Sequence, residues 1–151
     1  MTEQATEVSK EEGGRWLTAT IGSSGFRVDI VAGAFSLTAD EPVSVGGTDT
    51  GPTPYDYLLT ALGSCVVMTL RMYADRKKWP LVSATVHLRS GQSHELDCEN
   101  CETEAVGVKT IEQRLDLAGD LTEEQRARLL DIAGRCPVKQ TFERGIRIVQ
   151  V

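Results

Sequence analysis

The feature that most constrains this chain is one long stretch, Tyr55 to Lys77, that is apolar on nearly all sides. At about 100° per residue, its spacing predicts one helix with an apolar stripe centred on Cys65. That stripe consists of Leu58, Ala61, Leu62, Cys65, Met68, Thr69 and Met72. The apolar surface extends beyond it through Leu59, Val66, Leu70 and Tyr73. Such a helix is normally buried on nearly every side, so we expect a second copy of the chain to help cover it.

The remaining pattern predicts an α+β fold with largely antiparallel strands. The expected order is βββ-α-ββ-α-α-β, with residues 14–151 forming a single domain after a mobile polar tail at 1–13. Strands are expected at residues 16–21, 26–31, 35–39, 82–90, 108–117 and 146–151. A polar loop is expected at 91–107, and Thr122 with Gln125 forms a capping-box pattern that starts a helix ending near Gly134. Pro137 begins a last short helix.

Charge and composition exclude several kinds of partner. The 151 residues include 16 Lys and Arg against 22 Asp and Glu, a net charge of −6. This balance argues against nucleic acid or an anionic membrane surface as the main partner, because either requires a basic face. No uninterrupted apolar run reaches the roughly 18 residues of a membrane helix. The acidic start lacks the apolar core of a secretory signal, so we expect a cytoplasmic protein.

The cysteines are Cys65, Cys98, Cys101 and Cys136. In a cytosolic chain they favour redox or metal chemistry over permanent disulfides. Cys65 alone is most simply interpreted as a buried structural thiol. Pro137 places Cys136 at a helix N-cap, where free backbone N–H groups and the helix dipole predict a lowered thiol pKa. A purely structural role for Cys136 stays open on these grounds.

Two segments resemble the cysteine motifs of the OsmC/Ohr family, the osmotically inducible and organic-hydroperoxide-resistance proteins. They are GGTDTGPTPYDYLLTALGSCVVMTLRMYADRKKWPL (46–81) and CPVKQTF (136–142). The similarity extends from about residue 14 to the C-terminus. It implies an OsmC-like fold in which two subunits form an intertwined homodimer, with the long helices back to back inside wrapped sheets.

The resemblance also implies a reaction. Cys65 would be the peroxidatic thiolate that attacks an organic hydroperoxide, and Cys136 the resolving thiol that forms a disulfide with it. A dithiol reductant, such as a lipoyl protein or thioredoxin, would then restore both thiols. The expected substrate-binding residues are Leu58, Leu62, Met68 and Met72, whose apolar side chains suit an alkyl hydroperoxide. No cofactor is implied.

Related peroxidases activate the first cysteine with an arginine from the N-terminal sheet, which an acid just before the long helix holds in place. The resemblance makes Arg27 the arginine, with Arg15 as the alternative, and Asp56 the acid. The family's usual position for this acid corresponds to Tyr55. Asp56 is also nine residues from Cys65, which places it on the opposite side of a straight helix. This activating pair therefore matches the family less well than the cysteines do.

A competing signal lies at His94, Cys98 and Cys101, because Cys-x₂-Cys is a common zinc-ligand spacing. A complete zinc site needs four ligands, and the chain has no second Cys-x₂-Cys. A reversible disulfide and an inert loop are the alternatives, and the acidic neighbours Asp97, Glu99 and Glu102 disfavour a thiolate. The leading hypothesis is thus a peroxidase. The alternative is a non-catalytic protein of the same fold that senses redox state, binds metal or binds apolar ligands.

Overall fold

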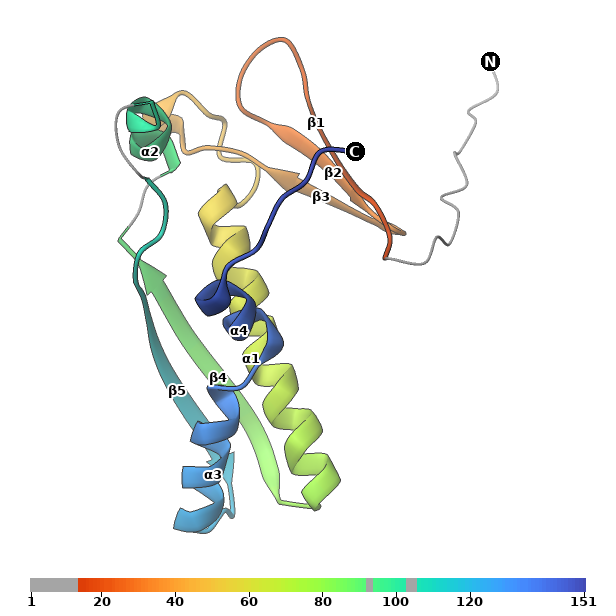
Figure 1. The fold of residues 1–151 in the computed structure, drawn as a ribbon, viewed down its shortest axis with the longest axis vertical. Coiled ribbons are helices and arrows are strands. Elements are labelled where there is room, and N and C mark those ends of the chain that lie inside the picture. The colour runs from red at the N-terminus through yellow and green to blue at the C-terminus, as the bar shows by residue number, and fades with distance from the viewer. Residues whose placement is uncertain (1–13, 92–93, 103–105) are drawn as a thin grey trace. The chain divides into compact units, whose positions relative to one another are not determined.

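The computed structural model describes residues 14–91, 94–102 and 106–151 (Figure 1). The predicted tail, residues 1–13, lies outside the described part. The described chain forms two compact units that divide between Pro54 and Tyr55, within the range predicted as one domain. Each unit is described below by itself.

The first unit contains a three-stranded antiparallel sheet in the order β1-β2-β3. Its strands are β1 (Leu17–Ile21), β2 (Val28–Ala32) and β3 (Phe35–Ala39). The three predicted strands are thus confirmed, with β2 beginning two residues later than expected. The tight turn between β2 and β3 contains Gly33, whose φ of +63° is easily adopted only by glycine. A short 3₁₀ helix, η1 (Val43–Val45), follows the sheet.

The loop that leads toward the long helix is folded around the carboxylate of Asp40, which is only 2% exposed. This carboxylate accepts the backbone N–H of Glu41 at 2.8 Å and the hydroxyls of Thr48 and Thr50 at 2.5 and 2.7 Å. These hydrogen bonds hold the pKa of the Asp40 carboxyl well below its usual range. The loop is also too tight for a side chain at Gly47, where a Cβ would lie 1.8 Å from the Glu41 carbonyl oxygen.

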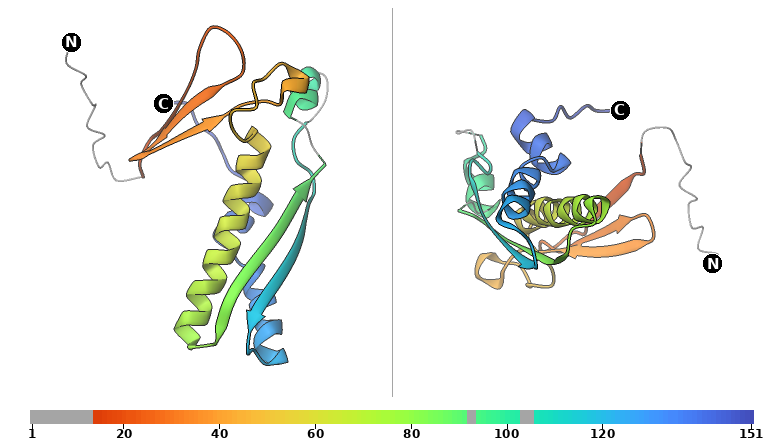
Figure 2. Two further views of the ribbon diagram at one scale, coloured as in Figure 1. Left: turned by 180° about the vertical axis from the view of Figure 1, so that it is seen from behind. Right: turned by 90° about the horizontal axis from the view of Figure 1, so that it is seen from below.

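The second unit is built around α1 (Pro54–Lys77). The strands β4 (Leu81–Ser90) and β5 (Ile111–Gly119) form an antiparallel ribbon, and α2 (His94–Asn100) lies between them in sequence. The helices α3 (Glu123–Ala133) and α4 (Pro137–Arg144) complete the unit. The ribbon runs along α1, and α3 and α4 also lie beside that helix (Figure 2). The predicted capping box of Thr122 and Gln125 is present at the start of α3.

The buried face of α1 differs from the predicted apolar stripe. The buried α1 residues are Leu62, Val66, Leu70 and Ala74, one i, i+4 row. They pack in one cluster with Leu81, Leu121, Leu129, Ile132, Ala133 and Cys136. Cys65 lies at the edge of this cluster, while Met68 and Met72 are 57% and 62% exposed. Because α1 is apolar all round, its own sequence does not select the buried face, and the ribbon and α3 do so by packing.

The alternation of β4 breaks at the start of the strand. Ala84, Val86 and Leu88 are partly buried, and strict alternation would add Val82 to them. Val82 is 74% exposed, however, and Leu81 is buried instead. The cause is a shift in the β4–β5 register between Leu81 and Ser83, which inverts the alternation at the start of the strand. Opposite this irregularity Gly119 approaches the backbone so closely that a Cβ would lie 2.1 Å from the Pro80 carbonyl oxygen.

Two segments have a different secondary structure from the one predicted. The expected polar loop at 91–107 contains α2, a seven-residue helix without the apolar periodicity that would have revealed it. The expected strand at 146–151 is not formed, and all of its residues are exposed. A strand requires a hydrogen-bonded neighbour, and the described residues of this single chain provide none for the segment.

The length and hydropathy of α1 would also permit a membrane span. Its best 18-residue window has a mean hydropathy of 1.3, and 22% of that window is buried. The core helix of a soluble protein can meet the same length and hydropathy criteria. Arg71, in the middle of α1, donates to the Val82 carbonyl oxygen at 3.1 Å and pairs with Asp75 at 3.2 Å. We therefore interpret α1 by its contacts, as a core helix with one face uncovered in the single chain.

We predict that Asp40→Asn lowers the Tm near neutral pH, because an amide cannot accept the hydrogen bonds that the carboxylate accepts. The folded-state pKa of Asp40 lies below its ordinary value of 3.8. The stability that this group contributes is therefore present above that pH and is lost as the pH falls below it. Thermal unfolding followed by circular dichroism should show a Tm difference from wild type that shrinks below about pH 4.

The matched control is Asp49→Asn, which makes the same charge change at an exposed residue of the same loop. It should leave the Tm nearly unchanged. Equal effects of the two substitutions would mean that net charge, and not the Asp40 hydrogen bonds, stabilises the loop.

Candidate active site

The second unit brings Cys65 and Cys136 together from α1 and the start of α4. Cys136 is the N-cap of α4, as predicted, and Pro137 follows it in the first helical turn. The Cys136 sulfur is fully buried and accepts the backbone N–H of Lys139 at 3.3 Å. The thiol of Cys65 lies close enough to interact with it by hydrogen bonding. Two residues 71 positions apart in sequence thus form one thiol pair.

The electrostatic environment of Cys136 differs from the prediction. Burial raises the pKa of the Cys136 thiol, and the neighbouring Cys65 thiol raises it further. The hydrogen bond from the Lys139 N–H lowers this pKa, as expected for a helix N-terminus, but burial is the larger effect. The nearby cations are also engaged, because Arg135 pairs with Asp131 at 3.2 Å and Lys139 pairs with Glu143 at 3.1 Å. This environment therefore favours the protonated form of Cys136.

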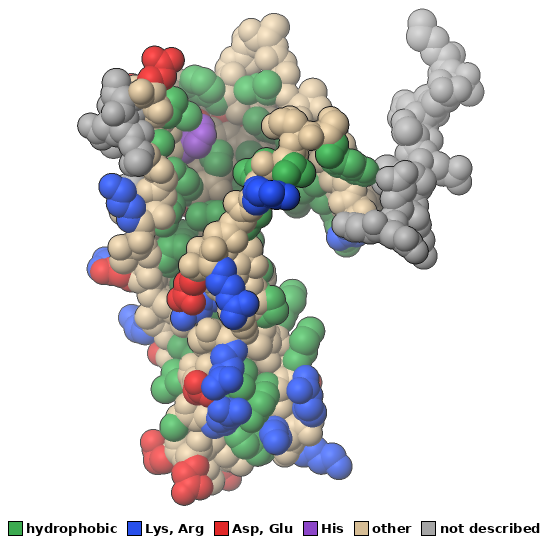
Figure 3. All heavy atoms as spheres, in the orientation of Figure 1, with side chains coloured by type: hydrophobic (Ala, Val, Ile, Leu, Met, Phe, Trp, Pro, Cys, Tyr) green, Lys and Arg blue, Asp and Glu red, His purple; other side chains and the backbone are tan. Residues whose placement is uncertain are grey.

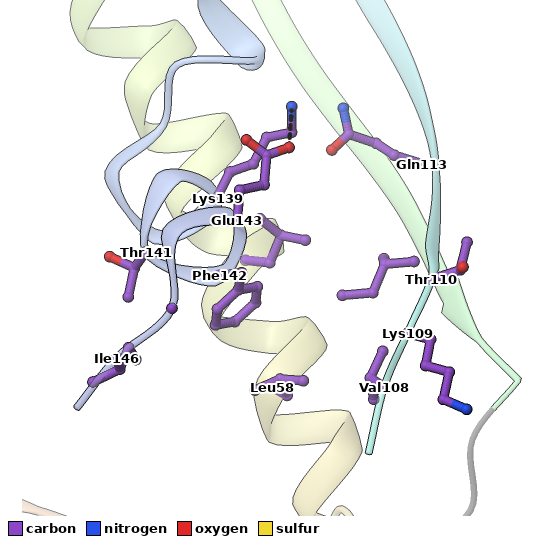
Figure 4. Close-up of a pocket in the computed structure, with 13 residues that line it drawn as sticks. Leu58, Val108, Lys109, Thr110, Gln113, Lys139, Thr141, Phe142, Glu143 and Ile146 are labelled. Atoms are coloured by element: carbon purple, nitrogen blue, oxygen red, sulfur yellow. Dashed lines mark ion pairs between the residues drawn. The ribbon is translucent and has the colours of Figure 1, made fainter. Parts of the chain in front are cut away.

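A pocket of about 820 Å³ lies between α1, the start of β5 and α4 (Figure 4). Its apolar lining consists of Leu58, Leu62, Val108, Ile111, Phe142 and Ile146. Figure 4 shows Leu58, Phe142 and Val108 directed toward the same space. Lys139 and Glu143 form their ion pair at one side of this lining. This pocket would hold an apolar ligand against α1, with one end of the ligand near the Lys139 and Glu143 side chains.

Two of the four predicted substrate-binding residues belong to this pocket. Leu58 and Leu62 line it, whereas Met68 and Met72 do not. Leu62 also belongs to the core cluster that contains Cys136 and against which Cys65 packs, so the pocket and the thiol pair share this cluster, although neither cysteine lines the pocket. Phe142 was missed as a lining residue, although it lies in the second cysteine motif, six residues after Cys136.

The two candidate arginines lie in the first unit. Arg27 pairs with Asp29 at 2.9 Å and its side chain is half exposed. The Arg15 guanidinium lies beside Gly33, 2.7 Å from where a Cβ of that residue would be. The activating role predicted for either arginine concerns a site in the other unit, and it stays a prediction.

The predicted acid, Asp56, lies in the second unit, so its position relative to Cys65 can be described. Asp56 is exposed and lines a shallow hollow between α1 and β4, together with Gly63, Val67 and Val86. Cys65 faces the core on a different side of α1. The geometry does not support Asp56 as a neighbour of the Cys65 thiol, because nine residues of straight helix turn it to the opposite side.

A second pair of thiols lies on and just after α2. Cys98 and Cys101 are both exposed and free. The Cys98 sulfur lies 3.6 Å from His94 Nε2, and the Cys101 thiol donates to the Cys98 carbonyl oxygen at 3.2 Å. Among the described residues, no three His, Cys, Asp or Glu side chains are grouped so that they could hold a metal ion. The zinc alternative stays a prediction, because residues 92–93 and 103–105 beside these thiols lie outside the described part.

The family model of OsmC-like protein matches residues 47–150 of this chain. No curated protein sequence matches it significantly. Among solved structures, an OsmC-like protein from Mycoplasma pneumoniae is similar with a TM-score of 0.69 and 19% identity, covering 84% of this chain and 85% of that one.

Some of the similar structures are of proteins named for organic hydroperoxide resistance. An organic hydroperoxide resistance protein OsmC from Legionella pneumophila has a TM-score of 0.62 and 18% identity, with 84% of this chain and 87% of that one covered. An organic hydroperoxide resistance protein from Elizabethkingia anophelis has a TM-score of 0.59 and 19% identity, covering 88% and 90%. At these identities the likeness establishes the α+β fold with its antiparallel sheets and long central helix.

We predict that Cys136 is alkylated by iodoacetamide at least about tenfold more slowly than Cys98 and Cys101 near neutral pH. Its thiol is buried and has a raised pKa, whereas the other two thiols are exposed. Timed labelling followed by peptide mass spectrometry measures each cysteine separately. In a denaturant the rates should become similar, and fast labelling of Cys136 in the folded protein would contradict the described burial.

Proposed function

Because the chain belongs to the OsmC-like protein family, we propose that it is a thiol-dependent peroxidase that reduces organic hydroperoxides through Cys65 and Cys136. The observation that carries this proposal is the contact between a partly exposed thiol and a fully buried one beside an apolar pocket. Such a pair can cycle between two thiols and one disulfide. Neither thiol is bonded to another cysteine in this structure.

The unequal environments assign the two roles. The Cys65 thiolate attacks the terminal oxygen of the hydroperoxide, the O–O bond breaks, and the leaving alkoxide takes a proton to become an alcohol. Cys65 is then a sulfenic acid. The Cys136 thiol attacks this sulfur, and the product is a Cys65–Cys136 disulfide with release of water. Burial and a raised pKa make Cys136 the weaker first nucleophile, which suits the resolving role.

The pocket supports an apolar hydroperoxide as substrate. Leu58, Leu62 and Phe142 would contact the alkyl part, because they provide apolar surface in the pocket, which shares Leu62 with the core cluster that contains Cys136. The structural relatives named for organic hydroperoxide resistance favour the same substrate class.

A dithiol regenerates the enzyme in this proposal. One thiolate of the reductant attacks Cys65, because Cys136 has no accessible surface. Cys136 leaves as a thiol, and the second reductant thiol then releases Cys65. A lipoyl protein or thioredoxin provides such a pair of thiols.

Arg27 is proposed to provide the cation that favours the Cys65 thiolate, with Arg15 as the alternative. A neighbouring cation lowers a thiol pKa and so raises the thiolate fraction near neutral pH. The two assignments are separated by comparing Arg27→Ala with Arg15→Ala, since the residue that activates Cys65 should show the larger loss of peroxidase rate.

A homodimer is the second part of the proposal. The uncovered face of α1 carries Ala61, Ser64, Met68 and Met72, all exposed in the single chain. Figure 3 shows hydrophobic side chains interspersed with charged ones on one face of the molecule. The C-terminal Ile146, Ile148, Val149 and Val151 are between 59% and 101% exposed. A second copy would bury this apolar surface and could pair with the unpaired C-terminal segment.

We predict that Cys65→Ser lowers the turnover of cumene hydroperoxide to below about one hundredth of wild type, because it removes the nucleophile. Peroxide consumption is measured with dihydrolipoamide and, separately, with thioredoxin. Cys136→Ser should still form one equivalent of Cys65 sulfenic acid, detected as a dimedone adduct by mass spectrometry, but it should not form the disulfide.

The control variant is Cys101→Ser, which removes a thiol outside the pair and should retain turnover. If Cys65→Ser matches wild type, or if peroxide joins Cys65 to a residue other than Cys136, the proposed mechanism is wrong.

We predict that the protein is a dimer by light scattering after size-exclusion chromatography, and that Met68→Glu with Met72→Glu shifts it toward the monomer. Two carboxylates on the uncovered α1 face would have to be desolvated in the dimer. Leu130→Glu is the control, because Leu130 is 54% exposed on a different helix and should leave the dimer intact. A wild-type monomer at micromolar concentration would contradict this part of the proposal.

A further inference from the structure

The thiols of α2 form a cluster that the proposed peroxidase reaction does not use. Cys98 lies in the last turn of α2 and Cys101 directly after the helix, and both are exposed. His94, one turn before Cys98, brings its Nε2 to 3.6 Å from the Cys98 sulfur. The Cys101 thiol is folded back over the helix end, 3.2 Å from the Cys98 carbonyl oxygen. Two thiols and an imidazole thus share one small surface.

From this arrangement we propose that Cys98 and Cys101 form a second redox site, a reversible disulfide that exchanges with small disulfides of the glutathione class. This goes beyond the proposed peroxidase function and does not depend on it.

The exchange proceeds in two balanced steps. His94 accepts the Cys98 proton, and the thiolate attacks one sulfur of the small disulfide, whose S–S bond breaks to release one thiol. The resulting mixed disulfide is attacked by Cys101, which gives up its proton. The Cys98–Cys101 bond forms and a second small thiol leaves, so one small disulfide is reduced and the dithiol is oxidised.

The geometry permits this bond with little rearrangement. Residues three apart on a helix have Cβ atoms about 5–6 Å apart, and a disulfide requires roughly 3.5–4.5 Å. Because Cys101 lies beyond the end of α2, it can close this gap without unwinding the helix. An exposed disulfide that closes so short a loop belongs to the labile kind, which reducing agents reopen readily.

The site is connected to α1 but separate from the peroxidase pair. The Tyr55 hydroxyl, in the first turn of α1, donates to the Asp97 carboxylate, and the Tyr55 and His94 rings meet edge to face at 6.1 Å. Asp97, Cys98 and burial raise the pKa of Tyr55 to about 12, so this hydroxyl stays a donor. Cys65 is ten residues farther along α1 than Tyr55, about 15 Å by helical rise, so the two thiol pairs lie at different levels of this helix.

The experiment equilibrates the full chain with glutathione and glutathione disulfide in varied ratios, with a chelator present so that no metal masks a thiol. Samples are quenched with acid, alkylated, and analysed by intact mass and peptide mapping. We use wild type and Cys65→Ser/Cys136→Ser, which has no peroxidase pair. In both, a loss of two hydrogens should map to Cys98–Cys101, and any further loss of two hydrogens in wild type should map to Cys65–Cys136. In Cys101→Ser, a single glutathione adduct should instead persist on Cys98.

Three results would overturn the proposal: both thiols stay reduced at every ratio, glutathione adducts accumulate on wild type without a Cys98–Cys101 disulfide, or the disulfide joins either residue to a different partner. If the double variant does not fold, the wild-type peptide map decides alone, because it distinguishes the two thiol pairs. Loss of peroxidase activity has no bearing on the result, since the peroxide reaction is not measured.

Discussion

The packing of one row of α1, from Leu62 to Ala74, positions the thiol pair and the pocket of the second unit. Full burial of a leucine or valine side chain, as at Leu62, Val66 and Leu70, contributes about 1.5–3 kcal/mol relative to exposure. The row holds α3 and the ribbon against α1, and the connection from α3 to α4 then sets Cys136 beside Cys65. The pocket borders the same row at Leu62, so its shape depends on the same contacts.

Two opposing effects meet at Cys136. A helix N-terminus stabilises a thiolate, and the Lys139 N–H does point at the sulfur. Removal from water destabilises the same thiolate, and at this fully buried position that cost is the larger. The two thiols thus differ in environment although they are the same residue type. The position at a helix start does not by itself lower the pKa of Cys136.

The sequence predicts much of this fold because its strongest signals are local. The long helix, the Thr122 cap, the Cys136–Pro137 helix start and the alternation of β4 each depend on neighbouring residues, and each is present. The features that the sequence did not predict correctly are determined by contacts with the rest of the chain. The buried face of α1 is selected by its neighbours, the position of Val82 by a register shift, and the pKa of Cys136 by burial. The helix α2 has no apolar period, so the pattern alone could not reveal it.

The absence of accessible surface at Cys136 has a further consequence for chemical damage. A sulfur that solvent does not reach is protected from direct oxidation to sulfinic or sulfonic acid, and from capping by small electrophiles. Cys65 is partly exposed and has no such protection. Irreversible oxidation of the pair would therefore occur mainly at Cys65. The time for which the pair stays active would then depend on how quickly Cys136 forms a disulfide with an oxidised Cys65, before Cys65 is oxidised further.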